Sequence, residues 1–262
     1  MIDIHNHLIP GVDDGAAGLE EARAALETMH AQGVRGVITT PHGNGAHTTS
    51  SDELDAFLGR IDPAWEKLKG MAAVNFPELR VERGLELMLD IPTPDLSDPR
   101  TRLAGTAFVL IEFSHSGIPP NSVDAIFRLK MNGWIPVIAH PERYAEVDEL
   151  RLVEGWRRAG AFLQLNCGSI VGRYGPQACA RAWRLLGEGC ADFLSSDYHA
   201  RGRCSITEAR VKLEESGGEE QAHLLMEANP GRLLEGELPV PVTPLKRTER
   251  SPWYRNLLRR GR

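Results

Sequence analysis

The sequence predicts an α/β protein in the form of a distorted seven-stranded barrel of alternating strands and helices. Two patterns support this class: short β-branched or apolar runs alternate with stretches of helical periodicity, and most runs are too apolar to leave a face in water. Seven such runs occur, at residues 2–5, 34–40, 81–89, 108–113, 135–139, 161–165 and 191–195. We therefore expect βα units around a parallel sheet, one unit short of the familiar eight-stranded barrel.

Helices are readable between some of these runs. Residues 20–32 and 177–188 have helical periodicity, and Gly33 and Gly189 follow them as C-terminal stop signals. Between residues 70 and 98 the helical pattern is weak, and three nearby prolines indicate a loop.

Two segments are expected along the chain. Residues 1–236 are predicted to form one domain, since barrels of βα units commonly reach this length without dividing. Residues 237–262, which begin with LPVPVTP, are predicted to be a Pro-containing linker and a basic tail. Both a solvated tail and a weak docking segment for a membrane or a kinase remain open.

Composition excludes several classes. Hydrophobic residues make up 42% and charged residues 25%, as in ordinary globular proteins. Because neither a signal peptide nor a long apolar run is present, we expect a cytoplasmic protein whose four cysteines are reduced. The net charge is −6, but residues 1–245 carry 23 basic and 35 acidic residues, a net of −12, which excludes a nucleic-acid surface.

Nearly every predicted strand ends in a residue that can bind a metal or a phosphate. In a parallel barrel the carboxyl ends of the strands open onto one face, where active sites are built from several strands. These strand-end residues are His5, His7, His42, Glu86, Glu112, His140, Asn166, Asp197 and His199. They predict a polar site at this rim.

The donor types indicate divalent metal ions. His5 and His7, like Asp197 and His199, stand two residues apart, so that in an extended segment both members of a pair point to the same side. The eight histidines and carboxylates among these strand-end residues, together with Asp14, make nine candidate ligands, enough for two or three ions bridged by Glu86 or Glu112. Imidazole and carboxylate without thiolate suit manganese, iron or zinc.

The remaining candidates fit phosphate chemistry. Closely spaced metals can activate water as hydroxide and neutralise the oxygens of an in-line displacement at phosphorus. Arg143, three residues after His140, and Arg201 or Arg203, just beyond His199, could offer forked donors to phosphoryl oxygens. The site thus predicts a metal-dependent phosphate-ester hydrolase.

The motifs MIDIHNHLIPGVDDG, TTPH, GLEL, IEFS, AHPERY, LQLNCGSIVGRYG, SSDYH and NPGRLLEG occur in this order over residues 1 to about 236. Together they resemble the PHP superfamily and, within it, the manganese-dependent bacterial protein-tyrosine phosphatases of capsule and exopolysaccharide operons, the CpsB/CapC type. This resemblance implies a barrel of the PHP type and a trinuclear site on the nine ligands named above. It also implies that Arg143 holds phosphate.

The resemblance further implies a substrate, the tyrosine-rich tail of a bacterial kinase that controls polysaccharide export. Two departures from the family pattern are visible. The family usually carries basic residues soon after the histidine of the second strand, whereas His42 is followed by GNGAHTTSS. The family also carries a second arginine five residues after the last histidine, but that position is Cys204 here. Arg203 is the expected substitute if the loop is one residue shorter.

A second motif in the sequence suggests an alternative catalytic mechanism. Residues 167–173, CGSIVGR, match the C-x5-R signature of cysteine-dependent tyrosine phosphatases, in which a thiolate attacks phosphorus. Cys167 would then be the nucleophile and Arg173 the oxygen-binding group. A short motif without its structural context is weak support, so the metal mechanism is preferred.

Three functions from different classes follow. The preferred one is a metal-dependent protein-tyrosine phosphatase that acts through a metal-bound hydroxide. The second is a phosphatase for a small metabolite such as histidinol phosphate. The third is a metal-binding regulator that grips a partner without turnover.

Overall fold

The computed structural model describes residues 1–114 and 117–246, and its nine strands are all parallel and form two sheets. The three-stranded sheet has the order β1-β2-β4, and the six-stranded sheet has the order β3-β5-β6-β7-β8-β9. The strands are β1 (Ile2–Asp3), β2 (Gly36–Thr39), β3 (His42–Asn44), β4 (Arg80–Arg83), β5 (Glu86–Met88), β6 (Phe108–Glu112), β7 (Ile135–Ala139), β8 (Phe162–Asn166) and β9 (Phe193–Ser195).

The predicted α/β class with parallel strands is confirmed, but the closed seven-stranded barrel is not. Residues 34–40, predicted as one strand, give β2, and after a break the separate short strand β3 follows; residues 81–89, also predicted as one strand, give both β4 and β5. Pro41 lies at the first break and has no N–H for a ladder. At the second break, a Cβ on Gly84 would lie 3.0 Å from the Leu103 side chain, so the close packing favours glycine here.

The carboxyl end of β1 also meets the residues that follow β9. Asn6 and Tyr198 form an isolated parallel bridge. The N–H of His7 donates to the carbonyl of Tyr198 at 2.9 Å, and the N–H of Asp197 donates to the carbonyl of His5 at 2.9 Å. The first and last strands therefore deliver His5, His7 and Asp197 to one place.

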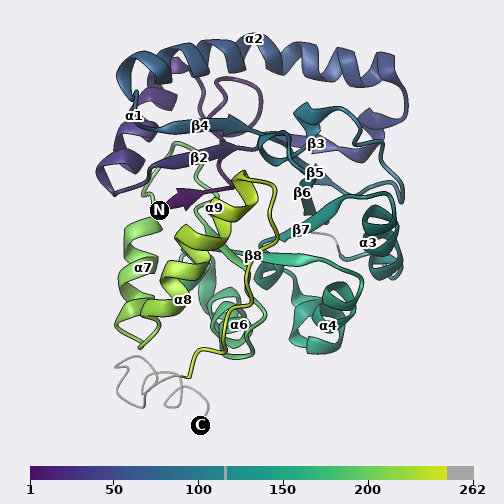
Figure 1. Cartoon of the computed structure of the whole chain (residues 1–262), viewed down its shortest axis with the longest axis vertical. Helices are drawn as coiled ribbons and strands as arrows, with labels where there is room; N and C mark the ends of the chain where they lie inside the picture. The colour runs from purple at the N-terminus through teal and green to yellow at the C-terminus, as the bar shows by residue number, and fades with distance from the viewer. Residues whose placement is uncertain (115–116, 247–262) are drawn as a thin grey trace.

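Helices surround the strands (Figure 1). They are α1 (Leu19–Ala31), α2 (Ser51–Asn75), α3 (Ser122–Met131), α4 (Leu150–Arg158), α5 (Cys167–Ile170), α6 (Gly175–Gly187), α7 (Ile206–Glu214), α8 (Glu219–His223) and α9 (Asn229–Leu234). The helices predicted at residues 20–32 and 177–188 correspond to α1 and α6, and Gly33 and Gly189 have positive φ values of 87° and 65° directly after them. The long α2 continues into the stretch where the sequence pattern was weak.

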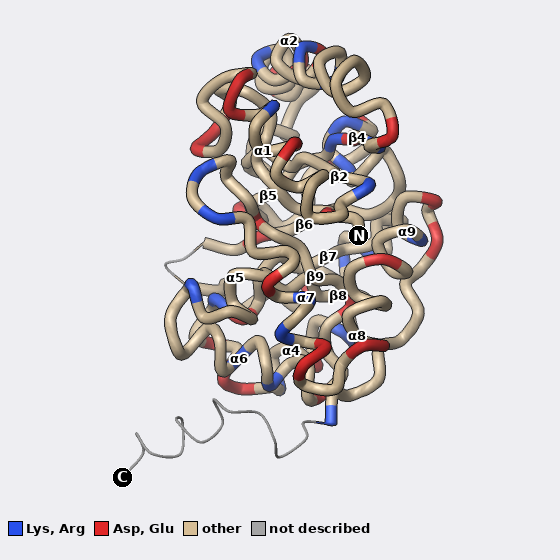
Figure 2. Tube along the Cα trace, turned by 90° about the vertical axis from the view of Figure 1, so that its left-hand side faces the viewer, with Lys and Arg blue, Asp and Glu red and all other residues tan. Residues whose placement is uncertain are grey.

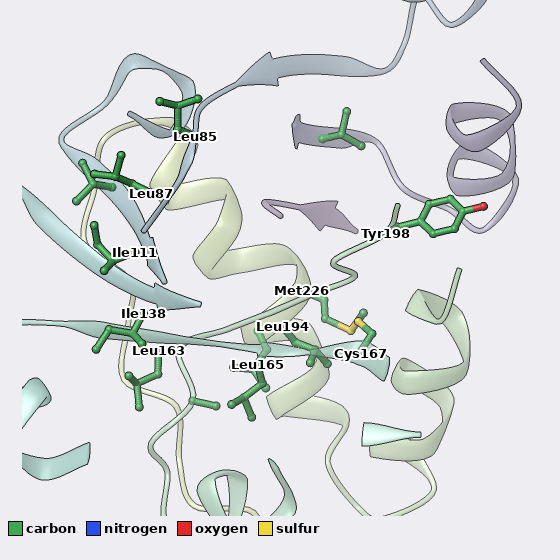
Figure 3. Packing of buried hydrophobic residues seen from close by; sticks show 14 of the residues in the cluster. Leu85, Leu87, Ile111, Ile138, Leu163, Leu165, Cys167, Leu194, Tyr198 and Met226 are labelled. Atoms are coloured by element: carbon green, nitrogen blue, oxygen red, sulfur yellow. The ribbon is translucent and has the colours of Figure 1, made fainter. Parts of the chain in front are cut away.

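Most strands are buried on both faces, as their apolar sequences predicted, whereas β3 and β4 carry exposed residues. Leu87, Ile111, Ile138 and Leu163 stand in register as one row across β5 to β8 and belong to the larger hydrophobic cluster (Figure 3). Alternate residues of the same strands face a second, smaller cluster that α9 completes with two leucines. Because both faces are buried, the register of these strands is fixed, and with it the position of the residues at their ends.

The segment after α9 packs on the body. The side chain of Asn229 brackets Val240, donating to its carbonyl at 3.0 Å and accepting from its N–H at 2.9 Å. Val242 and Leu245 are buried, and the N–H of Leu245 donates to the carbonyl of Leu186 at 2.9 Å. The residues interpreted as a linker thus lie against the body up to Leu245, and the basic tail from residue 247 lies outside the described residues.

The surface of the described chain carries both charges interspersed. Figure 2 shows Lys and Arg interspersed with Asp and Glu over the face in view. All four cysteines are free, in agreement with the expected reduced thiols. Among the helices of the described chain, none has the length and apolar character needed to cross a membrane.

Candidate metal centre

The structure brings all nine predicted ligands together at one site. Most of them lie at or after the carboxyl end of a strand, whereas His42 and Glu86 are the first residues of β3 and β5. Their donor atoms form four overlapping groups, and within each group the atoms lie within 4.8 Å of one another. The groups are His7, Asp14, His42 and His199; His5, Glu86 and His140; His5, His7 and Asp197; and His42, Glu86 and Glu112. Their assignment as metal ligands stays a prediction that this geometry permits.

Glu86 lies at the centre of the cluster and is 1% exposed. Its Oε2 atom lies 3.2 Å from Nε2 of His5, 3.3 Å from Nε2 of His7 and 3.1 Å from Nδ1 of His42. Its Oε1 atom lies 2.8 Å from Nε2 of His140. Burial alone would raise the pKa of Glu86, but the surrounding histidines outweigh it and hold the pKa well below its usual range. The two oxygens of Glu86 thus contact four histidines, and its surroundings favour the ionised carboxylate.

Asp197, which follows β9, lies beside His5 and His7. Its Oδ1 atom lies 3.5 Å from Nε2 of His5 and 3.4 Å from Nε2 of His7, while Oδ2 accepts a hydrogen bond of 2.7 Å from the Asn166 amide. Despite burial, which raises it, the nearby histidines lower the pKa of Asp197. Its backbone φ is +50° and that of His140 is +34°, a left-handed conformation that costs energy in residues other than glycine. Such strain at two strand ends is typical of functional sites.

Two hydrogen bonds orient the central histidines. Nδ1 of His5 lies 2.8 Å from Oε1 of Gln164, and Nδ1 of His7 lies 2.8 Å from Oδ2 of Asp13. Each ring therefore donates through Nδ1 to an oxygen and turns Nε2 toward the cluster, the arrangement that metal-binding histidines adopt.

This arrangement leaves electron-rich atoms facing one another. With Nδ1 protonated, the Nε2 atoms of His5 and His7 present lone pairs only 3.3 Å apart, beside the carboxylate oxygens of Glu86 and Asp197. Four converging lone-pair donors in a buried space need positive charge between them. Burial lowers the pKa of His7, but hydrogen bonds to Asp13, Asp197 and Glu86 raise it well above its usual value, so this place favours positive charge. The residues therefore fit divalent cations.

Exposure increases toward one end of the cluster. The side chains of His5 and His7 are fully buried, whereas those of His199, His42 and Asp14 are 30%, 40% and 69% exposed. Asp14 joins the open end, since its Oδ1 atom lies 3.5 Å from Nε2 of His42 and 3.4 Å from Nε2 of His199. A substrate can approach the cluster from this end.

Arg143 stands at the rim of the cluster. It belongs to the turn Pro141–Arg143 directly after His140. Its Nη1 atom lies 3.3 Å from Oδ2 of Asp197, and its guanidinium lies over the ring of Tyr174, with Cζ 4.8 Å from the ring centroid. The side chain is 27% exposed, so it can meet an anion from solvent.

The two arginines of the last loop are placed differently. Arg201 and Arg203 line a cavity of about 160 Å³ that Tyr174, Asp197 and His199 also line. An Nη atom of Arg201 donates to the carbonyl of Gly15 at 3.1 Å. The guanidinium of Arg203 is 73% exposed and pairs with Glu208 at 3.3 Å, so the structure does not direct it at the cluster. Its predicted phosphate contact stays a prediction.

The environment of Cys167 disfavours the thiolate mechanism. The residue is completely buried within the main hydrophobic cluster, which also holds Leu194 and Met226 (Figure 3). Burial raises the pKa of the thiol well above its usual value, the opposite of what a nucleophilic thiolate requires. The guanidinium of Arg173 is bonded to the Arg203 carbonyl and the Ser205 hydroxyl.

Three contributors were missing from the sequence interpretation. Asp13 stands beside Asp14 in VDDG, and only the fold shows that the two carboxylates have different partners. Gln164 precedes the predicted strand-end Asn166 by two residues, so alternation along the strand was the available signal. Tyr174 lies in the GRYG stretch, where nothing marked its contact with Arg143.

The chain is similar to proteins named as tyrosine phosphatases. Tyrosine-protein phosphatase YwqE of Bacillus subtilis (strain 168) is 33% identical over 246 residues, covering 87% of this chain and 89% of the relative. Putative tyrosine-protein phosphatase CapC of Staphylococcus aureus is 28% identical over 203 residues, covering 76% of this chain and 77% of the relative.

The fold of this chain also matches that of a solved structure. It is described as one of YwqE from Bacillus subtilis and CpsB from Streptococcus pneumoniae, unique metal-dependent tyrosine phosphatases. It matches with a TM-score of 0.79 at 30% identity, over 95% of this chain and 100% of the solved chain. Residues 1–235 also match the family described as capsular polysaccharide synthesis, CpsB/CapC. This chain therefore belongs to the CpsB/CapC family.

Proposed function

We propose that this chain is a metal-dependent protein-tyrosine phosphatase, a phosphoric monoester hydrolase that releases phosphate from phosphotyrosine. The observation that carries the proposal is the convergence of five histidines and four carboxylates, with Glu86 at their centre and Arg143 beside them. Relatives of the same length named as tyrosine phosphatases support the substrate class. No feature of the described residues favours a small metabolite such as histidinol phosphate.

The proposed metal ligands are the nine residues of the cluster, and the proposed ions are two or three divalent cations, most simply manganese. Such ions, when bound, lower the pKa of a coordinated water and neutralise phosphoryl oxygens. The absence of thiolate among the donors favours manganese, iron or zinc over softer ions.

The other tasks fall to protein side chains. Arg143 can bind the phosphoryl group from the rim, because its side chain is partly exposed and already lies against Asp197. The exposed end at Asp14, His42 and His199 gives access for a phosphotyrosine that projects from a protein surface. The buried histidines at the inner end exclude bulk water.

We further infer that the two sheets are parts of one PHP-type barrel of seven units. The break between β2 and β3 lies beside the break between β4 and β5. Hydrogen bonds continue there, because the N–H of Gly84 donates to the Thr39 carbonyl at 2.9 Å and that of Glu86 to the Pro41 carbonyl at 3.1 Å. The bridge between Asn6 and Tyr198 supports contact between the first and last units.

The proposed physiological setting is the bacterial cytoplasm, with a tyrosine kinase of polysaccharide export as the substrate. Membership of a family described by capsular polysaccharide synthesis supports this assignment. The basic tail is proposed to add weak docking to the kinase or to anionic lipid.

A side-by-side assay tests the proposed activity. The purified protein, supplied with manganese, would be given a phosphotyrosine peptide and histidinol phosphate at equal concentrations, with phosphate release as the readout. We expect faster release from the peptide. Preference for histidinol phosphate would contradict the substrate class, and no metal-dependent release from either would favour a regulator without turnover.

A further inference from the structure

Tyr174 lies beside the cluster and packs against its own loop. Gly172 and Gly175 flank it with positive φ values of 84° and 90°, and the N–H of Arg173 donates to the carbonyl of Gly168 at 2.8 Å. The ring packs against Gly168 so closely that a Cβ at that position would lie 2.6 Å from Cε2 of Tyr174. The position of the ring is therefore determined by backbone contacts.

Arg143 has two anchors within the described residues. One is the carboxylate of Asp197, 3.3 Å from Nη1, and the other is the ring of Tyr174, 4.8 Å below Cζ. An arginine side chain otherwise loses much rotational freedom when it binds an anion, and forked binding of phosphate requires a fixed guanidinium plane. A ring beneath the guanidinium supplies that constraint before the anion arrives.

We propose that Tyr174 is a positioning residue, which holds the guanidinium of Arg143 ready for the phosphoryl oxygens. The inference rests on the proposed function, because it concerns the same site. It differs from a second role for the ring, direct contact with the aromatic part of the substrate. Both roles predict weaker binding of an aryl phosphate when the ring is lost, but only positioning predicts weaker binding of inorganic phosphate, which has no ring.

Tyr174→Leu removes the ring, and Tyr174→Phe keeps it. We expect Tyr174→Leu to weaken inorganic phosphate binding about three- to tenfold in calorimetry of the metal-loaded protein, and to raise KM for a small aryl phosphate by a similar factor. Tyr174→Phe should stay within about twofold of the wild type. Phe127→Leu, at a 52% exposed aromatic position on α3, controls for the loss of a surface ring.

A double-mutant cycle decides whether Tyr174 acts through Arg143. In the Arg143→Ala background, the Tyr174→Leu change should cause no further loss of phosphate binding, because the residue it positions is gone. Metal content measured in each variant controls for damage to the cluster. Unchanged phosphate binding in Tyr174→Leu, or a full additional loss in the Arg143→Ala background, would overturn the proposal. The variants can show the expected differences in phosphate affinity while the wild type releases no phosphate from phosphotyrosine. In that case the proposed function fails and the positioning role stands.

Discussion

Oδ2 of Asp13 lies 2.8 Å from Nδ1 of His7, so a carboxylate outside the predicted ligand set fixes the ring that faces Glu86 and Asp197. The same oxygen lies 3.3 Å from the N–H of His42. Asp13 thereby ties the loop after β1 to two of the predicted ligands.

Asp13→Ala should weaken binding of divalent ions by about 10- to 100-fold, since His7 loses the partner that sets its tautomer and orientation. Competition with a chelating dye measures the affinity. Asp52→Ala, an exposed carboxylate in the first turn of α2, is the matched control. Equal affinity in the two variants would remove Asp13 from the site.

Arg143→Ala should lower turnover of a phosphotyrosine peptide by about 10²- to 10³-fold, because a charge-assisted contact to the phosphoryl group is lost. Bound metal, measured by elemental analysis, should not change. Arg203→Ala, made in parallel, tests the weaker prediction for the last loop. Near-normal turnover in Arg143→Ala would show that another group binds the phosphoryl oxygens, and a larger loss in Arg201→Ala would identify it.

Asp192 gives a prediction for stability that is independent of the metal centre. Its carboxylate is 2% exposed and accepts from the N–H of Leu163, and burial raises its pKa to about 6 although Arg157 lies 2.8 Å away. The folded protein therefore holds this proton more tightly than the unfolded chain. The resulting stabilisation is complete below about pH 4 and is lost as the pH rises through 6.

The free energy of unfolding of the wild type should accordingly fall relative to that of Asp192→Asn between pH 4 and 7, by on the order of 3 kcal/mol. Urea unfolding at several pH values measures the difference. The exposed Asp52→Asn variant should show no such trend. A constant difference between wild type and Asp192→Asn would contradict the raised pKa.

A shortened chain tests the proposed docking of the basic tail. Because Leu245 is buried and bonded to Leu186, the chain should end at Lys246, after the packed segment. We expect it to keep its activity on a small aryl phosphate and to lose weak, salt-sensitive binding to vesicles that contain anionic lipid. Equal binding by the full and shortened chains would refute docking to lipid.

Much of the architecture could be predicted because strands buried on both faces have continuous apolar sequences. Glycine stop signals placed the ends of α1 and α6 within two residues. The break between β4 and β5 could not be predicted, since it depends on the packing of another segment, Leu103 against Gly84. The packing of the segment before Leu245 was missed for the same reason. Its prolines suggest a linker, but the segment packs on the body and is hydrogen-bonded to α6.

The candidate ligands could be predicted because strand ends in parallel sheets share one edge. Their orienting partners could not. Gln164 and His5 are 159 residues apart in the chain, and the Asp13 pairing depends on the path of a loop. The burial of Cys167, which disfavours the thiolate mechanism, also became visible only in the folded chain.

The most direct measurement is activity on a phosphotyrosine peptide before and after exhaustive chelation, with metal content determined in the same samples. The account predicts that chelation abolishes phosphate release, that manganese or a similar ion restores it, and that Cys167→Ser follows the same course as the wild type. Full activity at a metal content near zero, with loss of activity in Cys167→Ser, would contradict it.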